Sequence, residues 1–428
     1  MEEVRMDIQN TLSTYINAEI DFWDFSGVIR ILQKGKILFE TSRGYANIEF
    51  GIKNSMMTRF NVASVTKQFT AFAIMILYDR GLLKLDEKAN QYLPSSIQIP
   101  SDITVNNLLS HTSGLYNYYN FEDDFYIAKD RAPYNKNTFF SDWINKKLVN
   151  KPGTVFNYNN SNYNLLAWII EKISGQTFNE FLTTNIFIPL EMRNSEYDNG
   201  QNIIMHKANN YIRDYGKLVR TPYSNNLFHI GAGALVTNCD DIQRWYECLR
   251  NRKLLSEQAY NIYFRENKNH YCYGLEQYNE GGKIKYSHGG DYVGVSAYTQ
   301  YLFEQDICII IISNTESLNQ YRFGNSLAAI MSGELPQISS KPDEVFVSTE
   351  ELEKYTGTYL PGKIHIETKN GKLYLVRVNQ NIHIELYCVG NNMFMRRYEE
   401  QQKPHILIQE GAIRPSIWGY ELVSKQFI

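Results

Sequence analysis

The 428-residue chain is predicted to fold as an α+β protein, with an antiparallel sheet flanked by helices, a helical subdomain and a small all-β C-terminal domain. Strand-like segments lie at both ends of the first 330 residues and helix-like segments lie between them, so the sheet has to be assembled from distant parts of the chain. A stretch rich in proline, serine and acidic residues then leads into alternating apolar and polar residues, which indicates a linker and a second, β-rich unit. Hydrophobic residues make up 43% of the chain, which is enough for a sizeable core.

The first predicted elements are a helix and a hairpin. Residues 6–19 repeat apolar side chains at helical spacing, which predicts an amphipathic helix. Residues 28–32 and 37–39 are β-rich runs on either side of Lys34-Gly35, and two such runs around a glycine turn predict a β-hairpin.

Helices dominate the middle of the chain. A long apolar helix is predicted from Ser64 to Arg80, and residues 85–230 are expected to be mostly helical with long loops. Residues 163–174 form one clear helix, because their apolar side chains share a face and Gly175 follows to end it. Strands are then predicted at residues 284–286, 294–303 and 307–313. A last helix is predicted at residues 318–331.

These patterns divide the chain into two domains. We expect a catalytic domain over residues 1–335, a linker over 336–348 and a small β-barrel-like domain over 349–428. In the last region Asn370-Gly371 separates two alternating segments, which is a strong signal for a β-hairpin.

Composition excludes several classes of partner. The net charge is -3 and no basic run stands out, so no nucleic-acid partner is expected. The five cysteines are odd in number and form no Cys-x-x-Cys pair, so neither a disulfide framework nor a zinc cluster is expected, and no cofactor is predicted.

The N-terminus lacks the pattern of a signal peptide, and the longest apolar run, Ala71–Tyr78, is too short to span a bilayer. We therefore expect a cytoplasmic protein as the chain is written, or a cell-envelope or secreted one if its N-terminus was trimmed.

The sharpest chemical pattern is Ser64-Val65-Thr66-Lys67, at the start of the predicted long helix. Positions three apart share a helix face, so the Lys67 amine can reach the Ser64 hydroxyl. A serine hydroxyl is a weak nucleophile until a base takes its proton, and a lysine can do so when burial lowers its pKa. The same pattern is found in β-lactamases and penicillin-binding proteins. Taken alone, the four residues are equally compatible with a helix turn that carries an exposed lysine.

Three ordered blocks raise the significance of this pattern: Phe60–Thr70, Gly81–Asp86 and Ile103–Leu115. Together they closely resemble the β-lactamase-related serine hydrolases of the class C and penicillin-binding-protein-like type, over roughly residues 20–335. That group includes class C β-lactamases, D-alanyl-D-alanine carboxypeptidases, D-aminopeptidases and esterases. Some family peptidases also carry a small β-barrel appendage that the C-terminal region resembles. The resemblance implies the β-lactamase/transpeptidase-like fold for the first domain.

The second family motif, Tyr-x-Asn, occurs several times in the chain, and the block from Pro152 to Tyr163 selects Tyr158 and Asn160. A phenol near ammonium-type neighbours is expected to have its anion favoured and to shuttle protons. The resemblance implies that Tyr158 protonates the leaving group and activates the deacylating water. It also implies that Asn160 holds the Lys67 amine and a substrate carbonyl.

The third motif, Lys-Thr-Gly in β-lactamases, is replaced here by His288-Gly289-Gly290, followed by Asp291. The two glycines suit a strand that approaches the substrate closely. The resemblance implies an oxyanion hole made by the N–H groups of Ser64 and Asp291, with His288 in the site. A histidine is only partly charged near neutrality, so it suits a substrate carboxylate less well than a lysine does.

Two further blocks are interpreted as structural. Residues 231–237 match a glycine-rich turn into a strand, which we expect to act as a wall of the site. His111 lies in a block that is structural in the family, so packing is favoured over a role as a triad histidine.

The sequence therefore predicts a metal-independent serine hydrolase that forms an acyl-enzyme on Ser64. A peptidase or amidase for peptides that contain D-amino acids, or an esterase, is favoured; the alternatives are a β-lactamase or a penicillin-binding sensor with slow deacylation. The expected partner is a small-molecule or short-peptide substrate, and the oligomeric state is left open. The C-terminal domain is expected either to border the site and limit substrate size, or to serve dimerisation or solubility.

Overall fold

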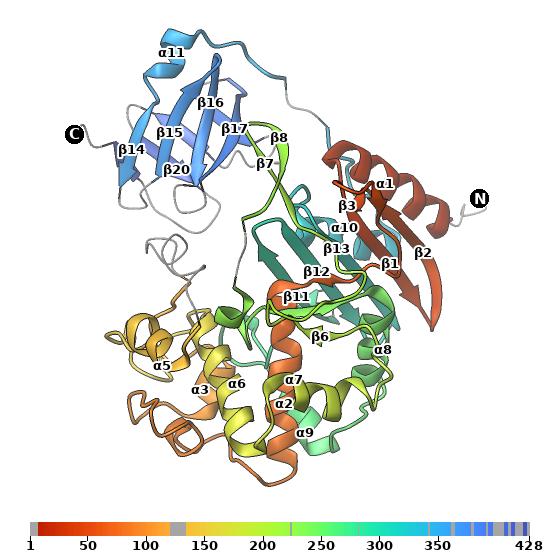
Figure 1. Ribbon diagram of the computed structural model, residues 1–428. Coiled ribbons are helices and arrows are strands. Elements are labelled where there is room, and N and C mark those ends of the chain that lie inside the picture. The colour runs from red at the N-terminus through yellow and green to blue at the C-terminus, as the bar shows by residue number, and fades with distance from the viewer. Residues whose placement is uncertain are drawn as a thin grey trace.

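The computed structural model describes most of the chain, as residues 7–119, 134–222, 225–280, 282–340, 343–360, 364–377, 381–390, 393–396, 406–409, 412–415 and 423–425. Figure 1 shows a larger part, built of helices around a sheet, and a small barrel of strands above it. None of the helices in those segments combines the length and the apolar character that a membrane crossing requires.

A six-stranded antiparallel sheet forms the centre of the larger part. Its strands are hydrogen-bonded in the order β10-β11-β12-β13-β1-β2, so the first strands of the chain lie beside strands from more than 200 residues later, as the sequence predicts. The strand β13, which is the last of the six in the chain, pairs with β1 along its whole length, from Gly27 opposite Ser313 to Gln33 opposite Ile307. The six strands are β1 (Gly27–Gln33), β2 (Lys36–Arg43), β10 (Glu276–Glu280), β11 (Lys283–Tyr292), β12 (Val295–Leu302) and β13 (Ile307–Ser313).

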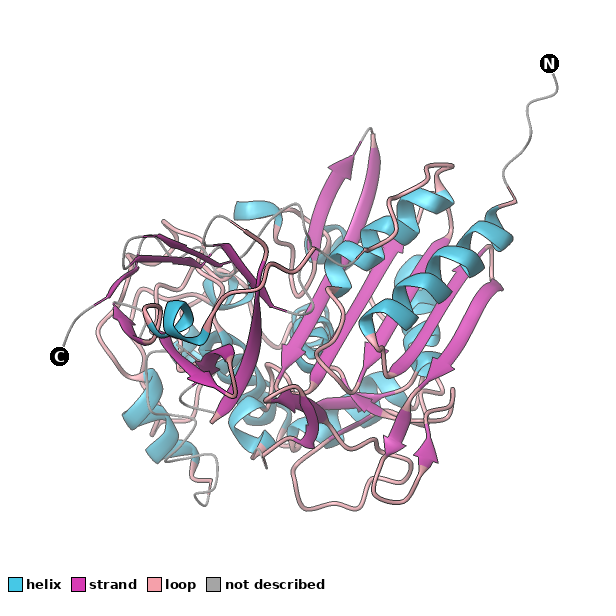
Figure 2. Cartoon of the chain, turned by 90° about the horizontal axis from the view of Figure 1, so that it is seen from above, coloured by secondary structure: helices cyan, strands magenta, loops and turns pink. Residues whose placement is uncertain are grey.

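The two faces of this sheet support two separate cores. Helices α1 (Ile8–Trp23) and α10 (Gln320–Met331) lie along one face (Figure 2), where they bury Ile309 and Ile311 of β13. The alternate residues Ile310 and Ile312 point to the other face and pack in the core of the helical region. Because successive side chains of a strand point to opposite faces, β13 has to be apolar at every position between its ends.

The helical region packs around α2 (Thr66–Asp79), which is buried almost throughout. The predicted helix from Ser64 therefore exists, but it begins with a 3-10 turn, η1 (Ala63–Val65). The clear helix of the middle region is α6 (Asn160–Ser174), and Gly175 ends it in the left-handed conformation as predicted. The other helices of this region are α3 (Val105–Leu109), α5 (Lys136–Phe139), α7 (Phe178–Leu182), α8 (Cys239–Arg250) and α9 (Glu257–Tyr263).

Several short strands lie within the larger part; the sequence analysis predicted β9, within residues 231–237, but not the others. One small sheet has the order β5-β9-β6, and its first strand leads directly into η1. A separate hairpin, formed by β7 and β8, extends away from the sheet toward the barrel (Figure 1). The bounds are β3 (Tyr45–Asn47), β4 (Ile52–Lys53), β5 (Phe60–Asn61), β6 (Glu196–Tyr197), β7 (Tyr211–Asp214), β8 (Lys217–Arg220) and β9 (Leu235–Thr237).

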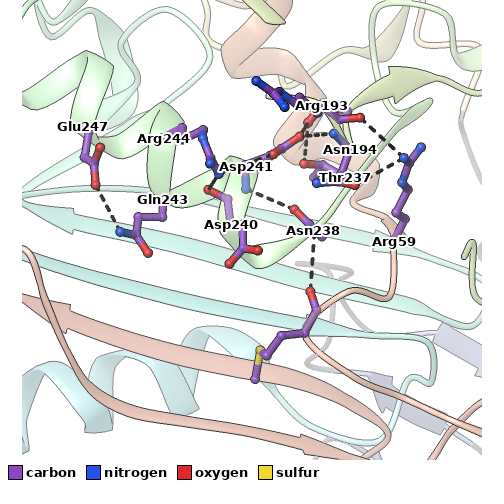
Figure 3. Close-up of polar contacts among 12 residues, drawn as sticks. Arg59, Arg193, Asn194, Thr237, Asn238, Asp240, Asp241, Gln243, Arg244 and Glu247 are labelled. Carbon is purple, nitrogen blue, oxygen red and sulfur yellow. Dashed lines mark hydrogen bonds and ion pairs between the residues drawn. The ribbon is translucent and has the colours of Figure 1, made fainter. Parts of the chain in front are cut away.

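A polar network fixes the small sheet against the start of α8 (Figure 3). Asn238 caps this helix by accepting the N–H of Asp241 at 3.0 Å. The Asp241 carboxylate accepts the N–H of Asn194 and the hydroxyl of Ser195, both at 2.7 Å. Arg59, just before β5, donates to the Asn194 side chain at 3.3 Å. Arg59, which precedes Ser64 by five residues, is thus connected through Asn194 to the start of α8.

The C-terminal strands form a closed barrel, as expected for an all-β domain. The helix α11 (Thr349–Glu353) precedes it, and Leu352 of this helix is buried in the barrel core with Ile366 and Leu373. The predicted hairpin around Asn370-Gly371 is formed by β15 and β16. The strands are β14 (Gly357–Leu360), β15 (Ile364–Lys369), β16 (Lys372–Arg377), β17 (Ile382–Cys388), β18 (Met393–Arg396), β19 (Ile406–Gln409), β20 (Ala412–Pro415) and β21 (Val423–Lys425).

Gly114 provides a test of the packing in the helical region. It has φ +71°, and a Cβ at this position would lie 1.9 Å from the carbonyl oxygen of Asn150. We expect Gly114→Ala to lower the free energy of unfolding by about 1–2 kcal/mol for the left-handed backbone and by a further ~1–3 kcal/mol for the steric overlap. Denaturant unfolding followed by circular dichroism measures this loss.

Gly175→Ala is the matched control. Gly175 has φ +69°, but a Cβ there would meet nothing within 4 Å. We therefore expect this variant to lose only the backbone contribution. Equal losses for the two variants would contradict the close contact between Gly114 and Asn150.

Candidate active site

Ser64 lies in η1, at the point where the short strand β5 turns into α2. The residue before it, Ala63, has φ +43°, a left-handed conformation that is unfavourable for a residue with a side chain. The Asn61 side chain accepts the Ala63 N–H at 2.8 Å, and the Thr66 hydroxyl donates to the Ala63 carbonyl at 2.6 Å. The strained turn is therefore held by side chains on both sides of Ser64.

Lys67 extends from the first turn of α2 to Ser64, as the spacing of the two residues predicts. Its Nζ lies 2.9 Å from Ser64 Oγ. The same nitrogen lies 2.8 Å from Asn160 Oδ1 and 2.7 Å from the carbonyl oxygen of Ala232. The amine thus has three oxygen neighbours, from three segments far apart in the sequence.

Lys67 is completely buried. Burial disfavours the charged ammonium, so the pKa of Lys67 lies well below its ordinary value of 10.5. A neutral amine has two N–H groups and one lone pair. Asn160 and Ala232 offer only acceptor oxygens to it, so they take the two N–H groups. The lone pair is then left for the Ser64 hydroxyl, which is the arrangement that a general base requires.

Tyr158 lies in the loop just before α6, and its ring centroid is 4.9 Å from Lys67 Nζ. Burial raises the pKa of the Tyr158 phenol well above 10, and a hydrogen bond with Ser64 offsets this only in part. The sequence argument that cationic neighbours favour the phenolate is therefore wrong. It assumed a charged lysine, whereas burial lowers the pKa of Lys67 and also dominates the pKa of the phenol.

His111 holds the loop that carries Tyr158. Its Nδ1 accepts the N–H of Asn159 at 3.1 Å, and its carbonyl accepts the N–H of Asn157 at 2.8 Å. Its ring centroid lies 4.4 Å from that of Tyr158. Since both neighbours of Tyr158 are bound to it, His111 fixes the position of the phenol, in agreement with the structural role that the sequence favoured.

The strand β11 passes directly beside Ser64. A Cβ on Gly290 would lie 2.2 Å from the Val62 carbonyl oxygen and 3.0 Å from the Ser64 nitrogen. A Cβ on Gly289 would lie 2.3 Å from the Tyr321 hydroxyl, on the side of α10. Both positions therefore need glycine because the strand is packed closely on two sides. The edge strand β10 pairs with β11 only as far as Ser287, so the glycines lie beyond its end.

His288 is buried near Tyr158, with the ring centroids 6.1 Å apart. Its Nδ1 lies 2.6 Å from the carbonyl oxygen of Gly289, which can only accept, so this nitrogen carries the ring proton. Its Nε2 then accepts from the Tyr271 hydroxyl at 3.1 Å. Burial lowers the pKa of His288 to about 3, so the imidazole is neutral.

Asp291 follows the glycines on β11, opposite Ser296 of β12. Its carboxylate accepts a hydrogen bond from the Gln320 side chain of α10 at 2.6 Å. The side chain is thereby tied to α10, whereas Gly290, the residue before it, faces Ser64. The carboxylate therefore lies on the α10 side of the strand, from where its charge contributes to the raised pKa of Tyr158.

The sequence analysis missed two contributors to this arrangement. The carbonyl of Ala232 belongs to the block that was expected to be only a wall, and a main-chain acceptor has no signature in residue type. Tyr271 is one of 32 tyrosines, and nothing in its sequence context marks it as the partner of His288.

Comparison with known proteins agrees with this geometry. The family model described as Beta-lactamase matches residues 17–330. Penicillin-binding protein 4* of Bacillus subtilis (strain 168) is 28% identical, over 91% of this chain and 94% of its own length. The crystal structure of a penicillin binding protein from Bacillus halodurans has a TM-score of 0.66 at 26% identity and covers 74% of this chain and 99% of its own.

A third similarity concerns the fold alone, because the identity is only 20%. The D-amino acid amidase from Ochrobactrum anthropi SV3, in complex with D-phenylalanine, has a TM-score of 0.63 and covers 76% of this chain and 98% of its own. The family match spans most of the chain and includes every residue of the Ser64 site. The chain therefore belongs to the beta-lactamase family and has the fold of its penicillin-binding-protein-like serine hydrolases.

Proposed function

We propose that the chain hydrolyses its substrate through an acyl-enzyme on Ser64. The observation that carries this proposal is the buried Lys67 amine, whose Nζ lies 2.9 Å from Ser64 Oγ and which has a lowered pKa. In the first step Ser64 Oγ bonds to the substrate carbonyl carbon, and its proton passes to the lone pair of Lys67. The N–H groups of Ser64 and Asp291 stabilise the resulting oxyanion.

The second half of the proposal concerns proton return. Tyr158, a neutral phenol, gives its proton to the leaving group and regains one from the Lys67 ammonium, so the bond to the leaving group breaks and the amine is neutral again. A water molecule then bonds to the acyl carbon, its proton passes through Tyr158 to Ser64 Oγ, and the bond between Oγ and the acyl carbon breaks to release the acid. Asn160 keeps the amine in place during both steps, since its Oδ1 lies 2.8 Å from Lys67 Nζ.

We propose substrates without a carboxylate at the position that faces His288: amides of D-amino acids or of peptides that contain them, or esters. The neutral imidazole offers no positive charge to a substrate carboxylate. The fold similarity to a D-amino acid amidase is compatible with this choice. The alternatives are a β-lactamase and a penicillin-binding sensor with slow deacylation. The name of the Bacillus subtilis relative, a penicillin-binding protein, favours the recognition of penicillin that both alternatives share.

Covalent labelling tests the proposed nucleophile. We expect a fluorophosphonate probe to add one adduct to the wild-type chain, and Ser64→Ala to remove it, because the probe bonds to the activated serine oxygen. Intact-protein mass spectrometry measures the adduct, and circular dichroism shows whether the fold survives. Ser141→Ala, at an exposed serine of the helical region, is the control and should label like wild type. Labelling of Ser64→Ala at the wild-type rate would contradict the proposal.

The state of His288 predicts the preferred substrate. We expect a neutral ester or a D-amino-acid amide to acylate Ser64 faster than a penicillin, whose carboxylate finds no fixed cation. Because the pKa of His288 is about 3, this preference should stay constant between about pH 5 and about pH 8. Values of kcat/KM for each substrate over this range measure it.

His288→Lys is the informative variant for the same measurement. We expect it to raise acylation by penicillin relative to the neutral ester, because an amine is more basic than an imidazole and the carboxylate of the bound drug favours its charged form. Rapid acylation of the wild-type chain by penicillin, followed by release of hydrolysed drug, would contradict the substrate proposal and establish a β-lactamase. A penicillin adduct that persists would instead favour the sensor.

A further inference from the structure

The turn between β11 and β12 lies just beyond the proposed oxyanion residue. It consists of Val293 and Gly294, and it starts two residues after Asp291. Gly294 has φ +71°, and a Cβ there would lie 2.4 Å from the Thr221 side chain and 2.9 Å from the carbonyl oxygen of Tyr211. The turn is therefore packed against the base of the β7–β8 hairpin.

The tip of this hairpin contacts the barrel at β17 (Figure 1). Tyr215 donates its N–H to the carbonyl of His383 at 3.0 Å, and the His383 N–H donates to the Asp214 carboxylate at 2.9 Å. The rings of Tyr215 and His383 stack with centroids 4.0 Å apart and planes 11° apart. The Tyr215 hydroxyl donates to Glu367 at 2.6 Å, and Lys369 Nζ lies 3.6 Å from the centroid of the Tyr215 ring. We call these five residues the hairpin–barrel contact.

An apolar cluster joins the same three parts. Ile212 of the hairpin, Val293 of the turn and Ile382 of the barrel are buried against one another. Tyr292 and Ile384 pack beside them. Val293 thus has its apolar side chain covered partly by the barrel, so undocking the barrel would expose apolar surface in the turn that follows β11.

Tyr292 extends this connection toward Lys67. Its ring centroid lies 5.3 Å from that of His229. The carbonyl of His229 accepts the N–H of Ala232 at 2.8 Å, and the carbonyl of Ala232 is the one that lies 2.7 Å from Lys67 Nζ. Continuous contacts therefore connect the barrel to two parts of the site. One is β11, the strand of the proposed oxyanion hole, and the other is the Ala232 carbonyl that accepts from the Lys67 amine.

We propose that the C-terminal barrel is a positioning element for the Ser64 site: through the hairpin–barrel contact and Val293 it holds the end of β11, and with it the main chain of Gly290 and Asp291, against the turn that carries Ser64. The inference rests on the proposed function and deepens it. Tyr215 and His383 are positioning residues, because they act through the β11–β12 turn and touch no reacting atom. A barrel that served only solubility would need neither the stacked pair nor the shared apolar cluster.

Substitution of Tyr215 in the full chain tests this. Tyr215→Ala removes the stack on His383 and the bond to Glu367, and we expect it to slow fluorophosphonate labelling of Ser64 and the kcat of ester hydrolysis by roughly 3–30-fold, the usual range for residues that couple distant sites. Tyr215→Phe keeps the stack and should lose much less. His383→Ala should give a similar loss, and the double variant should lose less than the sum.

The control is Phe346→Ala, which removes an aromatic side chain that is 90% exposed just before the barrel helix. It should label at the wild-type rate. Hydrogen exchange supplies a readout that does not depend on activity: residues 288–296 should exchange faster in Tyr215→Ala and not in Phe346→Ala.

The outcomes separate the two proposals. A labelled wild-type chain together with unchanged labelling in Tyr215→Ala would overturn the role of the barrel and leave the proposed function standing. A wild-type chain that the probe does not label would contradict the proposed function. The positioning role would then be decided by exchange, and unchanged protection of residues 288–296 in Tyr215→Ala would overturn it.

Discussion

The burial of the Lys67 amine is the constraint on which the rest of the site depends. A buried ammonium costs several kcal/mol unless it is fully paired, and the three oxygen neighbours of Lys67 include no carboxylate. Burial therefore favours the neutral amine, which can direct its two N–H groups at Asn160 and Ala232 and its lone pair at Ser64. Loss of either acceptor would leave an N–H group unsatisfied and free the amine to turn away from the serine.

The fold can be understood as the means of bringing these partners together. Ser64 and Lys67 come from the turn into α2, Asn160 begins α6, and Ala232 precedes β9. The strand β11 enters from the far end of the domain sequence and passes so close to Ser64 that Gly290 has no space for a side chain. The polar network around Asp241 and the barrel docked on the β11–β12 turn then restrain the elements on either side of the site.

Much of this architecture could be predicted from local sequence. The helix at 163–174 and the hairpin around Asn370-Gly371 have strong periodic and turn signals, and both are present. Ser64 and Lys67 could be paired because three residues along a helix bring side chains to one face. The short strands β6 to β8 could not be predicted, since two to four residues carry too little periodicity.

The remaining errors have a common physical origin. The protonation of Tyr158 depends on burial and on the state of Lys67, and neither follows from the list of neighbouring residues. The contribution of Ala232 comes from a main-chain carbonyl, which any residue would supply. The stacking of Tyr215 on His383 joins positions 168 apart, and no local pattern in either segment predicts it.

The most direct test is an NMR titration of the lysine side chains. The full chain, labelled with 13C at lysine Cε, should show one resonance that titrates well below pH 10.5, and this resonance should disappear in Lys67→Arg. Its pKa should also rise in Asn160→Asp, because a carboxylate next to the amine favours the ammonium. If every lysine instead titrates near its ordinary value, Lys67 is charged at neutral pH, and a neutral base at Ser64 is contradicted.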